Sequence, residues 1–519
     1  MITIPEFYSN RDVFITGATG FVGKVLIEKL VRSCPKIKRV FLLLREKRSK
    51  SISTRLEEIK NTPLFEKLRK ESPESLDKII AVEGDVGVSG LGLSSESLEL
   101  LKDVSVIFHS AASVRFDDIL KSAIILNTRG THETIKFALT LQHVAAFVHI
   151  STTYCYPDQS FIGEQTYPAQ GEWKRVVQIA EHFDTETLET LMPHLTNFSP
   201  NSYTYTKALS EQICDDYKNQ IPITIVRPSI VTGSEKEPIT GWCDNFNGPV
   251  GLLCACGIGI MRTMYASNTA ELNCVAVDLV AKTLIVAGWK CAIDNKKDSG
   301  QRRSSNEILN DKQLSVYNCA SQHNMDLNLL VYDGAYLIRN YPFERFVWLP
   351  GGGVTLCKVM NSFRIVCFQL LPALLLDQIL QLLGKKPMLM RLQRKIAHAS
   401  EALQIFIFSD WNFGVENFKG LNKVLLPSDD MDFNMSRSVP DIFDYYVHQI
   451  QGARRYLMKE PDSSIPASKR RLMRIMIIDR VLRCLLFCWI FYKIFMRYNL
   501  FGFKDFISES FNGTSIATF

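Results

Sequence analysis

The sequence predicts an α/β protein built on a Rossmann-type, doubly wound parallel sheet, with a smaller helical C-terminal domain and a C-terminal membrane-associated helix. Three observations lead to this fold class. A glycine-rich turn joins a predicted strand to a predicted helix, short apolar strands alternate with helical segments, and an apolar run lies near the C-terminus. A chain of 519 residues is too long for one hydrophobic core, so we expect more than one domain.

The composition excludes several classes of protein. Hydrophobic residues make up 46% of the chain and charged residues 22%, which indicates that most of it is folded. The net charge of +6 is too small for this length to suggest a nucleic-acid partner. The 13 cysteines show neither metal-ligand nor disulfide spacing, so we expect reduced thiols and no metal site. Residues 1–12 are polar and lead into a strand, so no cleavable signal peptide is expected.

The first strand, residues 11–16, runs into a glycine-rich turn, and helical periodicity follows over residues 22–30. Gly17 permits the tight turn, Gly20 lets the backbone approach a pyrophosphate, and Gly23 lets the helix pack closely. The phosphates then meet unpaired amides at the positive end of the helix. The cofactor-binding residues expected here are Thr16, Gly17, Thr19, Gly20, Phe21 and Gly23.

The end of the second strand, residues 39–44, indicates which dinucleotide is bound. NAD sites usually carry Asp or Glu at this point, to bind the ribose 2′-hydroxyl. This chain instead has Arg45 and Arg48, with Lys47 and Lys50 beside them. Because cationic groups neutralise a 2′-phosphate, we expect NADPH as the cofactor. The alternative is an ordinary solvated basic loop.

Further strands are predicted at 78–82, 104–108 and 145–150, and helical segments include 51–60 and 118–141. Continuous apolar strands that alternate with helices are typical of a parallel sheet covered on both faces. Small residues at the carboxyl ends of these strands fit a crevice in which a cofactor lies close to the backbone. The expected cofactor contacts there are Asp85, Val86 and Ala111, with Asp85 either binding the adenine amine or capping a helix.

Tyr203 and Lys207 are four residues apart, so on a helix they project from one face. A phenol has an ordinary pKa of about 10, and a neighbouring ammonium stabilises the phenolate and lowers that pKa. We therefore expect Tyr203 to act as the acid, Lys207 to lower its pKa and bind the nicotinamide ribose, and Thr152 to bind the reacting carbonyl oxygen.

Over residues 10–280 the chain resembles the extended short-chain dehydrogenase/reductase family. The matching pieces are Thr16–Gly23, Asp85-Val86, Ser110-Ala111-Ala112, Asn127–Thr131, Ser151-Thr152, Tyr203 with Lys207, and Arg227-Pro228. The resemblance implies that a Ser or Thr after the fifth strand binds the carbonyl. Ser151 and Thr153 compete with Thr152 for that role, and Asn127 joins the cofactor contacts. An insertion precedes Tyr203, and its residues 160–195 could form a lid.

A closer resemblance, to fatty acyl-CoA reductases, spans nearly the whole chain. It is carried by Gly241–Pro249, Val275–Asp278, Pro372–Asp377, Gly384–Pro387, Trp411–Phe413 and Phe443–Tyr456. The resemblance implies NADPH-dependent reduction of long-chain fatty acyl-CoA to a primary alcohol through an aldehyde, with release of coenzyme A. The expected divisions are a reductase domain at 1–290, a substrate region and linker at 291–362, a helical domain at 363–460 and a membrane anchor at 469–519.

Three other functions stay open. A membrane-bound sterol dehydrogenase would use the same reductase domain and an apolar C-terminal third. A reductase that stops at the fatty aldehyde would carry the same site. A non-catalytic nucleotide sensor would be expected to lose Tyr203, Lys207 or the glycine turn, and this chain retains them all.

Two apolar segments indicate membrane lipid as a partner. Residues 363–383 carry an amphipathic stripe that fits either a core helix or a membrane contact, and Pro372 and Asp377 disfavour a spanning helix. The strongest run of the last segment, from Val481, is about 16 residues or roughly 24 Å, shorter than a hydrocarbon core of about 30 Å. Basic residues precede it, so we expect a cytosolic catalytic domain on the endoplasmic reticulum, with peroxisome or lipid droplet as alternatives.

Overall fold

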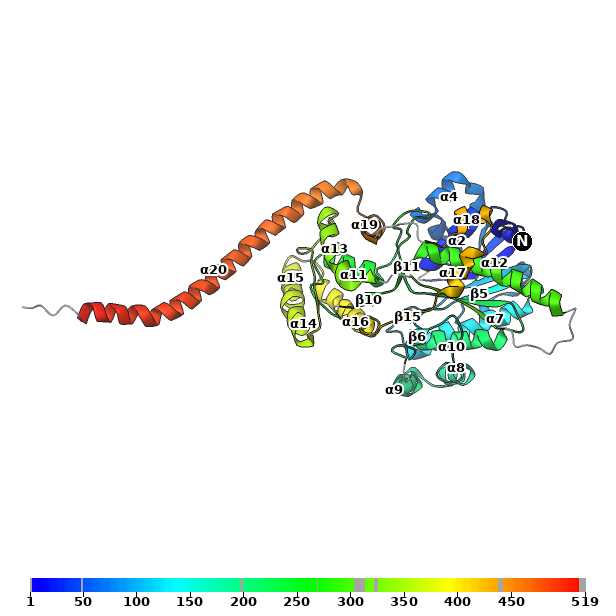
Figure 1. Ribbon diagram of the computed structural model, residues 1–519, viewed down its shortest axis with the longest axis horizontal. Coiled ribbons are helices and arrows are strands. Elements are labelled where there is room, and N and C mark those ends of the chain that lie inside the picture. Colours follow the sequence, from blue (N-terminus) through cyan, green and yellow to red (C-terminus); the bar gives the residue numbers. More distant parts are fainter. Residues whose placement is uncertain are drawn as a thin grey trace, which may run out of the picture.

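The computed structural model describes residues 2–47, 50–196, 199–267, 269–302, 313–321, 325–436 and 442–512, and within them the N-terminal half folds around a seven-stranded sheet (Figure 1). Its strand order is β12-β7-β5-β4-β1-β2-β3, and every neighbouring pair is parallel. The strands are β1 (Asp12–Thr16), β2 (Arg39–Leu44), β3 (Ile79–Glu83), β4 (Val104–His109), β5 (Ala146–Ile150), β7 (Ile223–Pro228) and β12 (Ser315–Cys319).

Both faces of the sheet are buried, which explains why its strands read as continuous apolar runs. Successive side chains of a strand point to opposite faces. In β1, Val13 and Ile15 therefore join one hydrophobic core, and Phe14 joins the other. α2 (Phe21–Ser33) and α12 (Val277–Arg302) pack in the first core, and α7 (Gly130–Thr140) and α10 (Ser202–Tyr217) in the second.

This architecture confirms the Rossmann-type, doubly wound fold class. β2 coincides with the predicted strand, and α3 (Ile52–Lys60) begins one residue inside the predicted helix. The segment predicted as one helix over 118–141 is three pieces: α6 (Leu120–Ala123), the π-helical η4 (Ile124–Arg129) and α7. α12 and β12 extend the sheet domain beyond residue 290, because β12 pairs with β7 at the edge of the sheet.

The predicted insertion forms α8 (Trp173–His182) and α9 (Thr185–Thr196), which do not form the expected lid. α8 packs on the outer side of α10 and η4, where the Trp173 indole donates a hydrogen bond to Asp216 at 2.8 Å. Both helices lie below α10 in Figure 1. The buried face of α8 explains this placement, because Trp173, Val176 and Val177 belong to the core under α10.

The helical C-terminal region is built around a third hydrophobic core. This core includes side chains from α11 (Gly248–Gly257), α13 (Leu327–Asn340), α16 (Leu389–Phe408) and α19 (Ile442–Gly452). α14 (Lys358–Ile365), the π-helical η5 (Val366–Leu370) and α15 (Leu371–Leu382) lie outside it, at the end of the body from which α20 (Ile465–Asn512) projects (Figure 1).

Part of the C-terminal region returns to the sheet domain. β15 (Asn412–Phe413) pairs with β6 (Phe161–Ile162), and α17 (Glu416–Lys423) and α18 (Pro427–Phe433) pack near α12. The Asp429 carboxylate accepts a hydrogen bond from the Ile4 amide at 3.1 Å, at the start of α1 (Ile4–Tyr8). The two halves therefore pack against each other.

Candidate active site

The glycine-rich turn requires glycine at two positions, one for its backbone conformation and one for lack of space. Gly17 has φ +73°, and a Cβ there would lie 2.6 Å from the Ala111 amide nitrogen. A Cβ at Gly23 would lie 2.4 Å from the Gly17 carbonyl oxygen, so the first turn of α2 closes directly onto the glycine turn. Gly20 is the exposed N-cap of α2 and supplies no side-chain cap. The open helix N-terminus fits the pyrophosphate of a dinucleotide.

The crevice opens where β1 and β4 are neighbours and the strand order reverses, which is where dinucleotides bind in such sheets. The Thr16 hydroxyl ties the two strand ends together: it lies 2.9 Å from His109 Nδ1 and accepts a hydrogen bond from the Ala111 amide at 3.2 Å. Thr19 is exposed and Phe21 half-buried at the mouth of the turn. Val86 is buried against Gly130 on the opposite helix, where a Cβ would approach it to 3.2 Å.

Two of the expected cofactor residues contact each other. Arg45 Nη1 donates to Asp85 Oδ2 at 2.9 Å, and about half of the Arg45 side chain is exposed. The second Asp85 oxygen accepts from the Gly87 amide at 2.9 Å, so the carboxylate orders its own loop. Arg55 donates to the Arg45 carbonyl and fixes the strand end. Arg48 lies outside the described residues.

Asn127 links the cofactor crevice to α10. Its Nδ2 donates to the Ser113 carbonyl at 3.1 Å and to the Thr206 hydroxyl at 2.9 Å, and its Oδ1 accepts from the Ser113 amide. Asn127 lies in η4, and π-helical turns frequently mark functional sites. The Asn127 carbonyl also accepts a hydrogen bond from Ser210 at 2.9 Å. Hydrogen bonds therefore hold the π-helical turn against α10, beside the predicted catalytic residues.

α10 begins one residue before the expected acid, Tyr203. Asn201 is the N-cap, and its side chain accepts a hydrogen bond from the Thr204 amide at 3.0 Å. Tyr203 is then on the open side of the first turn, half-buried, and Tyr205 points into the hydrophobic core. The side chains of Tyr203 and Thr152 are hydrogen-bonded. Of the three competing hydroxyls, that of Thr152 is thus the one that meets Tyr203.

The pKa of Tyr203 corrects one expectation. Burial raises this pKa above its ordinary value, as does the nearby Cys155, and the hydrogen bond with Thr152 opposes the shift only in part. The sequence predicted that Lys207 lowers it. Burial disfavours the phenolate, so the phenol stays protonated, which suits a group that gives up a proton during a reduction.

Lys207 is buried beneath Tyr203 and is held by backbone. Its Nζ donates to the Ile150 carbonyl at 2.6 Å, at the carboxyl end of β5. Burial lowers the pKa of Lys207 to about 8, and the carboxylate of Glu211 opposes this shift. The ammonium is therefore poised near neutrality, where a small change in its surroundings alters its charge.

Glu211, which the sequence reasoning missed, lies one helical turn beyond Lys207. Its carboxylate accepts hydrogen bonds from Arg227 Nε at 2.8 Å and Nη2 at 2.5 Å. Both side chains are fully buried. The Tyr156 hydroxyl donates to Glu211 at 2.9 Å, and Cys155 Sγ lies 3.4 Å from it. The four-residue spacing from Lys207 was a signal, but the ion-pair partner of Glu211, Arg227, lies on β7 and not on α10.

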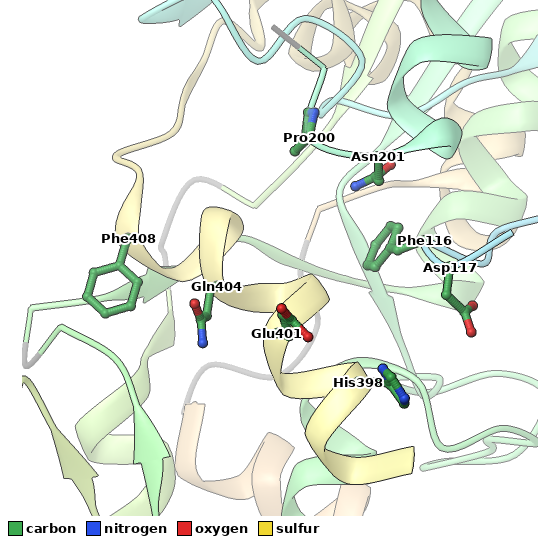
Figure 2. Close-up of a pocket in the computed structure, with 8 residues that line it drawn as sticks. All are labelled: Phe116, Asp117, Pro200, Asn201, His398, Glu401, Gln404 and Phe408. Carbon is green, nitrogen blue, oxygen red and sulfur yellow. The ribbon is translucent and has the colours of Figure 1, made fainter. Parts of the chain in front are cut away.

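A pocket of about 580 Å³ adjoins the start of α10. Figure 2 shows α16 on one side of it and the loop of Phe116 on the other. The Phe116 ring lies 6.0 Å from that of Tyr203 and stacks on Phe406 at 5.1 Å, so the pocket and the expected acid are neighbours. The lining residues are Phe116, Asp117, Pro200, Asn201, His398, Glu401, Gln404 and Phe408.

Aromatic side chains continue from this pocket into the body. Tyr154 contacts Phe406, Trp411 and Phe413 edge to face, with ring centroids 4.9–5.3 Å apart. These residues lie far apart in the sequence, at position 154 and at positions 406–413. From the sequence, only Trp411 and Phe413 stand out, as part of a family motif, and neither is expected in the site. Only the folded chain brings residue 116 next to residue 406.

The sheet and the glycine turn define the class: the protein is an NAD(P)-binding oxidoreductase. Two family models match it, both described as male sterility protein, over residues 15–284 and 368–460. Fatty acyl-CoA reductase 1 of Mus musculus is 35% identical over 92% of this chain and 90% of its own length. Fatty acyl-CoA reductase 2 of Homo sapiens is 33% identical over 94% of this chain and 92% of its own. The chain belongs to the fatty acyl-CoA reductase family.

Solved structures with the same fold include reductase domains of large synthases. The terminal R domain of the myxalamid PKS-NRPS pathway aligns with TM-score 0.54 and 18% identity, over 86% of this chain and 90% of that one. The R domain of a nonribosomal peptide synthetase from Mycobacterium tuberculosis aligns with TM-score 0.54 and 19% identity, over 85% and 92%. At these identities the likeness concerns the fold.

Proposed function

We propose that the protein reduces long-chain fatty acyl-CoA to the primary fatty alcohol, with NADPH as reductant. The observation that carries the proposal is the position of Tyr203. This phenol is hydrogen-bonded to Thr152 and opens, past Phe116, onto a pocket shared by the sheet domain and α16. The fatty acyl-CoA reductases that match over nine-tenths of the chain support this substrate class.

The chain's own residues divide the work of each reduction. NADPH, when bound, supplies hydride. Thr152 orients the carbonyl oxygen, and Tyr203 gives its proton to that oxygen as negative charge develops. Lys207, fixed to the Ile150 carbonyl, stabilises the phenolate that remains. Asn127 holds α10 against the crevice, which keeps these groups in register.

Two reductions give the alcohol. The first forms a hemithioacetal on the substrate, which expels coenzyme A as its thiol and leaves the aldehyde. The second reduces the aldehyde in the same way. Each alcohol therefore consumes two NADPH and two protons. The pocket next to Tyr203 supports a second reduction of the aldehyde at the same site.

The preference for NADPH rests on Arg45. Its guanidinium is half exposed at the end of β2, and its one ion pair among the described residues is with Asp85. A 2′-phosphate would place two negative charges beside this cation, which favours NADPH over NADH. Lys47 lies two residues further along the same loop, and Lys50 pairs with Glu58.

We also propose that α20 tethers the enzyme to a membrane, with the catalytic body in the cytosol and the endoplasmic reticulum as the favoured membrane. From Met473 to Ile494, α20 exposes apolar side chains along its length, and basic residues precede them. Arg471 anchors the start of the helix to the body by donating to the Glu344 carbonyl at 3.0 Å. An exposed apolar helix that leaves the body is suited to lipid.

Purified protein incubated with NADPH and a panel of acyl-CoA chain lengths tests this function, with aldehyde and alcohol products resolved. The proposal predicts alcohol and free coenzyme A from long-chain thioesters. A parallel panel of sterols with oxidised and reduced cofactor tests the competing dehydrogenase. Sterol turnover without thioester reduction would reject the proposal, and accumulation of aldehyde alone would limit it to the first reduction.

A further inference from the structure

The helical stretch α14–η5–α15 carries an apolar surface that the protein body leaves uncovered. By length and composition it is the one stretch among the described residues that qualifies as a membrane-spanning helix. The most exposed of its apolar side chains are Leu382 at 88%, Val359 at 78% and Leu375 at 62%. We call the following residues the apolar face: Val359, Met360, Phe363, Val366, Phe368, Leu371, Leu374, Leu375, Leu376, Ile379 and Leu382.

The opposite side of the same stretch is tied to the body at three points. Asn361 Oδ1 accepts from the Thr263 hydroxyl at 2.8 Å, and Gln369 Oε1 accepts from the Arg262 amide at 3.2 Å. Asp377 accepts backbone amides at the beginning of α16, from Met388, Leu389 and Met390, each at 2.9 Å. All three side chains are buried, so the attachment runs from α14 to the middle of α15.

These attachments decide how the stretch meets lipid. A spanning helix would carry Gln369 and Asp377 through the hydrocarbon core and lose their hydrogen bonds, which is costly. A helix that lies along the surface keeps all three and still removes its apolar face from water. The geometry therefore favours a stretch that lies in the membrane plane, with one side against the protein and the other in lipid.

Charge next to the apolar face selects the partner. The segment after α15 carries exposed basic side chains and no acidic one before Glu401: these are Lys385, Lys386, Arg391, Arg394 and Lys395. A cluster of exposed cations that follows an apolar face in the chain matches the anionic headgroups that border a leaflet. A second copy of this chain would bring the same cations against one another.

We propose that α14–η5–α15 is a monotopic membrane contact, which inserts its apolar face into one leaflet with Lys385 and Lys386 at the headgroups. It is separate from α20 and lies at the end of the body from which α20 projects (Figure 1). Both elements can therefore meet the same membrane.

This contact deepens the proposed function, on which its role in catalysis rests. Asp377 joins the end of α15 to the start of α16, and α16 carries Glu401, Gln404 and Phe408 to the pocket. Phe406 of the same helix stacks on Phe116, next to Tyr203. α16 therefore connects the apolar face to the pocket, which supports delivery of long acyl chains from the leaflet to the site.

Photocrosslinking of the full chain on vesicles tests the contact directly. Benzoylphenylalanine is placed at Val359, Phe368, Leu375 or Leu382, and in a matched control at Leu98, which is 44% exposed on α5 (Ser95–Leu101) of the sheet domain. The vesicles contain phosphatidylcholine and phosphatidylserine, with alkyne-bearing lipid in the outer leaflet only. All variants keep α20, so the Leu98 control measures what tethering alone produces.

The proposal predicts outer-leaflet lipid adducts at all four positions, at least tenfold above the Leu98 control. Crosslinks between two protein chains in place of lipid adducts would assign the apolar face to a second copy and overturn the proposal. Yields equal to the control would overturn it as well. Adducts at Val359 but not at Leu382, or the reverse, would indicate a spanning helix and reject the in-plane arrangement.

A comparison of KM values for acyl-CoA and for NADPH separates the role of the membrane contact in substrate capture from the reaction at the active site. The double variant Phe368→Ser/Leu375→Ser should raise KM for vesicle-borne acyl-CoA at least fivefold and leave KM for NADPH unchanged, whereas Leu98→Ser changes neither. An unchanged KM for acyl-CoA would overturn the role of the contact in substrate capture. Crosslinking does not depend on turnover, so failure of the proposed reaction would leave the lipid adducts in place.

Discussion

Replacing either of two tyrosines in α10 by phenylalanine gives a matched test of the proposed acid. Tyr203→Phe removes the hydroxyl that is hydrogen-bonded to Thr152, whereas Tyr205→Phe removes a hydroxyl with no hydrogen-bond partner among the described residues. The two positions lie two residues apart in one helix and differ in direction. Tyr203 borders the pocket through Phe116, and Tyr205 is 1% exposed in the core.

The two substitutions should differ in their effect on kcat by orders of magnitude. Loss of a positioned general acid costs about 10²–10⁴-fold in rate, or roughly 3–5.5 kcal/mol of barrier, so Tyr203→Phe should nearly abolish kcat. Tyr205→Phe removes a buried polar group without a partner, so stability should be unchanged or rise by about 1 kcal/mol, with activity retained.

Steady-state oxidation of NADPH with a long-chain acyl-CoA gives kcat and KM, cofactor fluorescence gives NADPH affinity, and thermal unfolding reports stability. NADPH affinity should be similar in both variants. An inactive Tyr205→Phe protein beside an active Tyr203→Phe protein would refute the orientation of α10 on which the mechanism depends.

Three further predictions follow from contacts around the site. Arg45→Asp places a second carboxylate beside Asp85, so the preference for NADPH over NADH should fall at least tenfold. An unchanged ratio of kcat/KM for the two cofactors would show that Arg45 does not select the cofactor. The carboxylate of Glu211 raises the pKa of Lys207, so Glu211→Gln should lower that pKa further. The decline of kcat/KM above pH about 8 should then begin at a lower pH. An unshifted pH profile in the folded variant would contradict this coupling. A chain ended after Arg480 keeps the body contacts of α20 and loses most of its apolar length, so alkaline carbonate should extract a larger fraction of it from membranes than of the full chain. An unchanged fraction would place the main anchor outside α20.

The sequence was most informative where the determinants are local. The glycine turn could be predicted because Gly17 and Gly23 meet a steric requirement within eight residues. β2 and β5 could be predicted because strands buried on both faces are continuous apolar runs. Tyr203 and Lys207 share a helix face by their spacing alone.

The remainder depends on contacts between distant segments. The pocket joins Phe116 to α16, almost three hundred residues later, and no local pattern encodes that approach. Arg227, on β7, forms a buried ion pair with Glu211 of α10. The pKa of Tyr203 was predicted in the wrong direction, because spacing revealed the nearby ammonium but not the burial of the phenol. Within the expected lid at 160–195, α8 packs instead on the outside of α10, where Trp173 is buried.

The most direct test of the central claim is the fate of the hydride. Incubation of the enzyme with NADPH deuterated at the transferred position and a long-chain acyl-CoA, followed by mass spectrometry of the alcohol, counts the transfers to the former thioester carbon. Two reductions at one site predict an alcohol with two deuterium atoms at C1 and one free coenzyme A per alcohol. An alcohol with a single deuterium, or deuterated sterol in place of fatty alcohol, would contradict the account.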